Sequence, residues 1–262
     1  MPHRVMPKRD GEGKLPRVIH RSYCGADPER SMISSLLAFV LLLKVHILSR
    51  LFFRLENEWI GGEPENQWRD TRIIALINHT SLYEPLIAGF AEIRLLWKFA
   101  RHGVLPVAEK TMKRRIGLYF RTLVRHVVVV TRQRDHTWDR VLNQLDSKSI
   151  VIILPEGRMM RADGLDATGR EMTIRGGIAD ILGVLPEGRM LVVYSGGLHH
   201  IQTPGDLLPT PFRTIRCRME MVDIADYKEE VKKSHPDLDF RGAVIADLTR
   251  RRNSSCPTVD TK

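Results

Sequence analysis

The sequence predicts an α/β protein with a layered, largely parallel sheet flanked by helices. Short apolar runs, typical of buried strands, alternate along the chain with stretches of helical pattern. Polar loops that contain His, Glu and Arg follow several of these runs, where parallel sheets gather their ligand-binding residues. A long apolar segment at residues 31–53 precedes the alternating pattern and predicts an additional N-terminal helix.

Composition limits the classes of function. The 262 residues are 43% hydrophobic and 27% charged, which suits one large domain, or one domain with appended segments. The net charge of +10 favours an anionic partner: nucleic acid, lipid headgroups or a phosphorylated substrate. With only 6% aromatic residues and no nucleic-acid-binding motif, nucleic acid is not the expected partner. Three widely spaced cysteines predict neither a disulfide framework nor a metal site.

The N-terminal part of the chain divides into two segments. Residues 1–30 are polar and basic, and they predict a mobile tail. Residues 31–56 include the most apolar stretch, but its uninterrupted core is shorter than the ~20 apolar residues of a spanning helix. Lys44 and Arg50 interrupt the stretch, which suits a helix that dips into a membrane from its basic side. The alternative is a buried core helix of a soluble domain.

The alternating elements begin with the run RIIALI at residues 72–77. This run stops at a polar Asn-His-Thr-Ser, which predicts a buried strand that enters a loop. Pro85 suits the first turn of a helix over residues 86–91. Residues 94–99 are predicted to form the next strand.

The pattern continues beyond a basic amphipathic stretch at residues 109–124. Runs of β-branched and other apolar residues predict strands at 127–131, 149–154, 190–194 and 213–221. Periodic stretches predict helices at 138–145, 174–182 and 238–252.

The loop after the first predicted strand, NHTSLYEP at residues 78–85, carries the first candidate site. On a regular helix His79 and Glu84 would point about 140° apart, but a loop that turns into a helix at Pro85 can bring them together. Glu84 would then fix the tautomer of His79 and leave the other ring nitrogen to accept a proton. The pair forms the base and orienting group of a catalytic triad, with a substrate hydroxyl as the nucleophile. The alternative is a loop histidine that caps backbone groups.

Two further polar loops follow predicted strands. Glu156, Gly157 and Arg158 follow the run SIVIIL, and Arg132 follows VVVVT. Glycine permits close backbone approach, and arginine can bind a phosphate through two hydrogen bonds. Three loops at one edge of a sheet can therefore converge on an anionic substrate. A second LPEGR, at residues 185–189, precedes a strand, so we expect it to be a connecting loop without a functional role.

In this order the motifs resemble those of the glycerolipid acyltransferase family, whose best-known members are the 1-acylglycerol-3-phosphate (lysophosphatidic acid) acyltransferases. The family's first motif, Asn-His followed after four residues by an acid, is matched at residues 78–84. Its second, an apolar strand ending in Arg, is matched at 127–132, and the Pro-Glu-Gly of its third at 155–157. The resemblance covers about residues 70–200 and includes an N-terminal membrane-contacting helix.

The resemblance implies transfer of a fatty acyl group from acyl-CoA or acyl carrier protein to a hydroxyl of a lysophosphatidic-acid-like glycerolipid. His79 would deprotonate that hydroxyl and Glu84 would hold His79. The implied substrate-binding residues are Asn78, Ser81, Arg132, Glu156, Gly157 and Arg158. No metal, further cofactor or covalent acyl-enzyme is implied, and the expected location is the cytoplasmic face of a membrane. The expected organisation is a basic tail at 1–30, a membrane-associated helix at 31–56, a catalytic domain at 57–252 and a C-terminal tail at 253–262.

The chain departs from the family pattern at several positions. Glu84 stands where the family usually has Asp, as it does in the lipid A (lauroyl-type) acyltransferases. Arg158 lies one position before the expected arginine, where this chain has Met159, and we expect Arg158 to take that role. The departures leave the acceptor open, so another lysolipid or an amino-acid lipid is the alternative substrate. A catalytically idle, basic membrane-binding homologue is the alternative that is not an enzyme.

Overall fold

The computed structural model describes residues 28–258, except residues 67, 114–116, 118–119, 121, 125, 132–134 and 203–207. The strands are β1 (Arg54–Trp59), β2 (Thr71–Ile77), β3 (Gly103–Ala108), β4 (His126–Val130), β5 (Ile150–Ile153), β6 (Arg189–Ser195) and β7 (Thr214–Asp223). The helices are α1 (Pro28–Phe52), the 3-10 helix η1 (Glu84–Phe90), α2 (Ile93–His102), α3 (Glu109–Met112), α5 (His136–Asn143), α6 (Gly177–Val184), α7 (Ile224–Ser234) and α8 (Phe240–Ser255).

The described strands form one seven-stranded sheet in the order β1-β7-β6-β2-β5-β3-β4. All neighbours pair in parallel except β6 and β7, so β1 and β7 run against the other five strands. The prediction of an α/β fold with a largely parallel sheet is therefore confirmed. The carboxyl ends of β2 and β5 lie side by side at one edge, and β6 flanks β2 on its other side.

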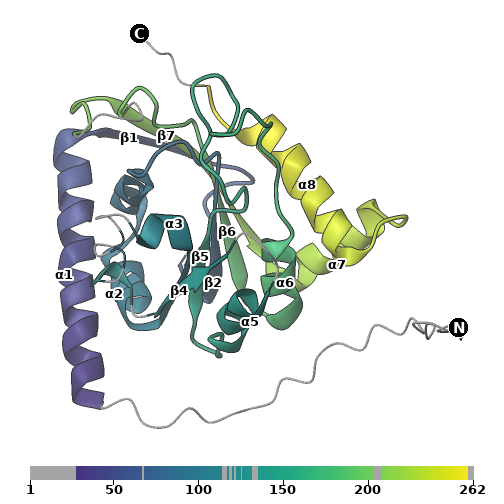
Figure 1. Ribbon diagram of the computed structural model, residues 1–262, viewed down its shortest axis with the longest axis horizontal. Helices are drawn as coiled ribbons and strands as arrows, with labels where there is room; N and C mark the ends of the chain where they lie inside the picture. Colours follow the sequence, from purple (N-terminus) through teal and green to yellow (C-terminus); the bar gives the residue numbers. More distant parts are fainter. Residues whose placement is uncertain are drawn as a thin grey trace, which may run out of the picture.

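Helices cover both faces of the sheet (Figure 1). Helices α5, α6, α7 and α8 pack on one face, where Ile73 and Ile77 are fully buried. Helices α1, η1 and α2 lie on the other face, where Ile74 and Leu191 belong to a second apolar core. Because the central strands are buried on both faces, they consist of continuous apolar runs rather than alternating residues.

Most predicted elements are confirmed with shifted ends. Every predicted strand except that at residues 94–99 is present, as are the predicted helices after residue 137, and the second LPEGR connects α6 to β6. The helix expected at residues 86–91 is the 3-10 helix η1. Strand β1 and helix α7 were not predicted. The basic stretch at 109–124 begins as α3, but several of its arginines, like residues 1–27 and 259–262, lie outside the described residues.

The prediction of a strand at residues 94–99 is wrong, because this segment belongs to helix α2. Leu95, Leu96, Phe99 and Ala100 are all buried, and their spacing places them on one helical face against the sheet. The strand of this region follows at β3. A Cβ atom on Gly103, the first residue of β3, would lie 2.5 Å from the carbonyl oxygen of Phe99, so only glycine fits this sharp change of direction.

Helix α1 buries Ser35, His46 and Ser49 against the protein and turns much of its apolar surface outward. A stripe along the helix is buried against the domain: Ser35, Ala38, Leu42, His46, Ser49 and Phe53, the last just beyond the helix end. The exposed apolar residues, which we call the outer face of α1, are Met32, Ile33, Leu36, Leu37, Val40, Ile47, Leu48, Leu51 and Phe52. Residues Met32–Phe52 are long and apolar enough to cross a membrane, and only 28% of the most apolar part is buried.

Candidate active site

The candidate site begins where β2 ends at the carboxyl edge of the sheet. Asn78, the first residue after β2, has a left-handed backbone with φ of 71°. Asparagine adopts this conformation more readily than other side chains that carry a Cβ atom. The chain therefore leaves the sheet sharply, and a short loop leads from His79 to Glu84, the first residue of η1.

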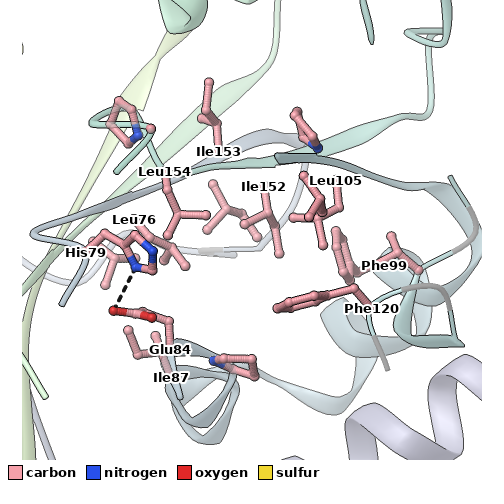
Figure 2. A pocket seen from close by; sticks show the side chains of 18 of the residues that line it. Leu76, His79, Glu84, Ile87, Phe99, Leu105, Phe120, Ile152, Ile153 and Leu154 are labelled. Atoms are coloured by element: carbon pink, nitrogen blue, oxygen red, sulfur yellow. Dashed lines mark ion pairs between the residues drawn. The ribbon is translucent and has the colours of Figure 1, made fainter. Parts of the chain in front are cut away.

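His79 and Glu84, the dyad, meet as predicted. Nδ1 of His79 lies 3.0 Å from Oε1 of Glu84, and the two side chains are 17% and 6% exposed (Figure 2). The longer side chain of Glu thus reaches the imidazole across this loop. The Nδ1 atom has no partner with straight hydrogen-bond geometry among the described residues, so the contact is a bent ion pair. Contacts of this kind commonly tighten when a substrate binds.

Backbone donors hold the carboxylate of Glu84 beside His79. Its Oε1 also accepts hydrogen bonds of 2.9 Å from the backbone N–H groups of Thr80 and Ser81. Burial acts to lower the pKa of His79, but the charge of Glu84, the contact with it and the charge of Glu156 together raise that pKa above its ordinary value. The dyad is thus set up to stabilise an imidazolium, the form that a general base reaches after accepting a proton.

Asn78 joins the ends of three neighbouring strands. Its backbone N–H donates to Oε1 of Glu156, which follows β5, at 2.8 Å. Its side-chain Nδ2 donates to the carbonyl oxygen of Ser195, the last residue of β6, also at 2.8 Å. The side chain expected to bind substrate therefore bonds to the protein and fixes the base of the loop that carries His79.

Glu156 and Gly157 lie beside the dyad, as predicted. Glu156 is 1% exposed, its Oε2 has no hydrogen-bond partner among the described residues, and burial raises the pKa of its carboxyl group. Gly157 has φ of 61° and donates its N–H to the carbonyl oxygen of Leu154, closing a tight turn. This turn brings the buried carboxyl group toward His79, whose charge acts on the pKa of Glu156.

Arg158 pairs with Asp166, a residue of the loop between β5 and α6. Arg132 lies outside the described residues, so its predicted role stays a prediction. Two arginines that the sequence analysis did not select also line the cavity at the site, Arg175 and Arg241. Arg175 donates from Nε to the carbonyl oxygen of Glu156 at 3.1 Å. The signal that would have identified Arg175 is its position just before two glycines at the start of a helix.

Ser81 is fully buried and bonds to a second loop, which follows β6. Its Oγ donates to Oε1 of Gln202 at 2.9 Å and accepts the N–H of Tyr83 at 3.1 Å. The hydroxyl of Thr80 accepts the N–H of Leu198 from the same loop at 2.7 Å. Ser81 therefore holds the dyad loop in place. Gln202 lies 121 residues away along the chain, so no local sequence pattern could have identified it.

A cavity of about 460 Å³ extends from the dyad between the sheet and the helices α2 and η1. Its walls are mainly apolar. In Figure 2 the dyad lies at one end, Phe99, Leu105 and Phe120 lie at the other, and Ile152 lies between them. Pockets of about 300–1,000 Å³ are typical of small-molecule sites. The arrangement thus joins a positioned base to a long apolar compartment.

Comparison of the sequence with protein-family models and with curated proteins finds no match. Within the described residues, no group of three His, Cys, Asp or Glu side chains could hold a metal ion.

Proposed function

We propose that the protein is a membrane-associated acyltransferase that moves a fatty acyl group from acyl-CoA or acyl carrier protein to a hydroxyl of a lysophosphatidic-acid-like glycerolipid. The observation that carries the proposal is the His–Glu dyad at one end of a long apolar cavity. A base beside such a cavity suits a substrate with a hydrocarbon chain and a reactive group at its end. The resemblance of the motifs to the glycerolipid acyltransferases supports the same reaction.

The dyad acts as a general base in this reaction. His79 accepts the proton of the acceptor hydroxyl, and Glu84 stabilises the imidazolium that forms. The hydroxyl oxygen attacks the thioester carbonyl of the donor, forming a C–O bond. The C–S bond then breaks, and the leaving thiolate takes the proton from His79. Acyl transfer is complete in one ternary complex, and the dyad returns to its starting state.

The apolar cavity suits the acyl chain. The chain would extend from the dyad past Ile152 toward Leu105 and Phe99, which line the far end (Figure 2). Each methylene that leaves water contributes about 0.8 kcal/mol, so a cavity of fixed length selects chains that fill it. A chain that is too long would meet the side chains of Leu105 and Phe99 at the far end.

Leu105→Trp is expected to shift the donor preference to shorter acyl chains. Leu105 is 8% exposed at the far end of the cavity, so the larger ring takes up space there. We expect the kcat/KM for the longest accepted donor to fall about tenfold or more, because a misplaced thioester loses alignment with His79. The measurement is acyl transfer by purified protein from a ladder of acyl-CoA and acyl carrier protein donors to a panel of lysolipids.

Activity with the shortest donors is the internal control, since it shows that the variant is folded. An unchanged chain-length profile would place the acyl chain elsewhere. If the wild-type protein transfers no acyl group to any acceptor but still binds liposomes, the proposal fails in favour of an idle membrane-binding homologue. The accepted lysolipid identifies the headgroup. Arg175 and Arg241, which line the cavity, are the cations that we expect to face it, and Arg241 also pairs with Asp180.

The outer face of α1 supports membrane association. Its large apolar side chains are exposed along the whole helix, whereas the polar His46 and Ser49 are buried. Lys44 and Arg50 are exposed on the same helix, and the chain carries a net charge of +10. Anionic lipids of a cytoplasmic leaflet attract such a basic surface.

The packing of α1 favours a helix that lies in one leaflet over one that spans the bilayer. Helix α1 lies along the side of the domain (Figure 1). Its Phe39 contacts Trp97 of α2 at 5.3 Å between ring centroids. A spanning orientation would carry α2 into the hydrocarbon with its exposed Glu92 and Arg94. A charge at the bilayer centre costs at least about 2.5 kcal/mol.

Replacing Leu36 and Leu37 by serine is expected to weaken liposome binding on the order of tenfold or more, because both are over half exposed on the outer face of α1. Co-sedimentation with anionic liposomes measures the effect. The matched control replaces Val184 and Leu238, exposed apolar residues of other parts of the chain, by serine. If both double variants bound liposomes equally well, α1 would not be the membrane contact.

A further inference from the structure

Two polar side chains of α1 bond to the short helix that begins with Glu84. Nδ1 of His46 lies 3.0 Å from the carbonyl oxygen of Ala88, and Oγ of Ser49 donates to the carbonyl oxygen of Leu86 at 2.6 Å. A carbonyl oxygen only accepts, so Nδ1 of His46 must carry the proton. Both side chains are buried, at 7% and 0% exposure, so these bonds lie inside the protein.

Gly89 allows this close approach of α1 to η1. A Cβ atom at this position would lie 2.6 Å from Oγ of Ser49 and 2.7 Å from Cδ1 of Leu55. Both atoms belong to tightly packed side chains, so any larger residue would push the two helices apart. Leu42 of α1 also lines the cavity, so the same helix forms part of its wall.

We infer that α1, through His46 and Ser49, is the positioning element that holds η1 and with it Glu84 against His79. The inference rests on the proposed function, because it assigns α1 to the dyad of that same site. The helix with the lipid-facing surface then also sets the geometry of the base. A change in how α1 is seated on the domain is transmitted to Glu84 through two carbonyl groups of a single 3-10 helix.

The pKa of His79 depends on how close Glu84 lies to its imidazole ring. The groups that act on it are Glu84 from the start of η1 and Glu156 from the loop after β5, while burial opposes both. Glu84 also acts on the pKa of His199, from the loop after β6, and Arg252 of α8 acts on the pKa of Glu156. If η1 moves away from His79, the contribution of Glu84 weakens and that of burial remains, so the pKa of His79 falls.

The test is a titration of His79 by NMR in the full chain embedded in lipid nanodiscs, with the signal assigned by comparison with His79→Gln. Ser49→Ala and His46→Ala are each expected to lower the pKa of His79 relative to wild type. The kcat for acyl transfer should fall about tenfold while the KM for the acceptor changes little, because the base and not the acceptor site is displaced. His46→Asn should restore both values, since its amide places a donor where Nδ1 was.

The control is Leu48→Ala, which removes an outer-face side chain next to Ser49 and should leave the titration unchanged. Gly89→Ala is an independent perturbation that should act in the same direction as Ser49→Ala. An identical titration of His79 in wild type, Ser49→Ala and His46→Ala would overturn the inference. A wild-type protein that transfers no acyl group but shows the shift in the variants would refute the proposed function and leave the coupling in place.

Discussion

Replacing His79 by alanine is expected to lower the rate of acyl transfer by about 10²–10⁴-fold, the usual contribution of a positioned general base. His79 lines the cavity, and its pKa is raised by two carboxylates. Without it the acceptor hydroxyl keeps its proton and is a weak nucleophile. Single-turnover acyl transfer to the lysolipid accepted by wild type measures the loss.

Two controls separate a chemical loss from a structural one. Liposome binding should remain at the wild-type level, because the outer face of α1 is untouched. His136→Ala, a change of an exposed histidine at the start of α5, should leave the rate unaltered. If His79→Ala still transferred the acyl group at the wild-type rate, the dyad would have no part in the mechanism. The cavity would then be only a lipid-binding site.

Glu84→Gln is expected to lower the maximal rate about a hundredfold or more, because the imidazolium loses its counter-charge while the side chain keeps its shape. It should also move the acid limb of the pH–rate profile. The base is active when His79 is neutral, so the wild-type rate falls as the pH drops through the raised pKa of His79. Without the charge of Glu84 that pKa falls, and the acid limb shifts to lower pH.

The measurement is kcat/KM across the pH range for wild type and Glu84→Gln. Glu92→Gln, at an exposed carboxylate before α2, is the matched control and should preserve both the rate and the limb. An acid limb at the same pH in all three proteins would show that His79 does not titrate beside Glu84. An acid limb that moves to higher pH in Glu84→Gln would contradict the prediction that Glu84 raises the pKa of His79.

The sheet could be predicted where strands are buried on both faces. The runs at β2, β5 and β6 are apolar over most of their length because each face is covered by helices, and β7 alternates along its length. Strand β1 could not be found, since this edge strand is mostly exposed and has no apolar pattern. Helix α2 was predicted to be a strand because IRLLWKF contains adjacent apolar residues. Only the burial of Leu95 and Phe99 on one face identifies the segment as a helix.

The sequence predicted contacts in the site only between residues that lie close together in the chain. His79 and Glu84 are close in the chain, and the turn at Asn78 and the start of η1 bring them into contact. Asn78 bonds to Glu156 and Ser195, 78 and 117 positions away, and Ser81 bonds to Gln202, 121 positions away. These bonds within the protein left no local pattern in the sequence. The sequence also placed Arg158 near the site, but it did not show that Arg158 pairs with Asp166.

The place of β1 in the sheet affects the order of events during synthesis. Strand β1 follows α1 directly, yet the strand it pairs with among the described residues is β7, and Glu56 meets Arg216 across 160 positions of sequence. A ribosome adds about 5–20 residues per second, so β1 waits on the order of ten seconds or more for its neighbour. Until then the sheet cannot hold the end of α1. We therefore expect α1 to enter the lipid first and the nascent domain to close on a helix that is already embedded.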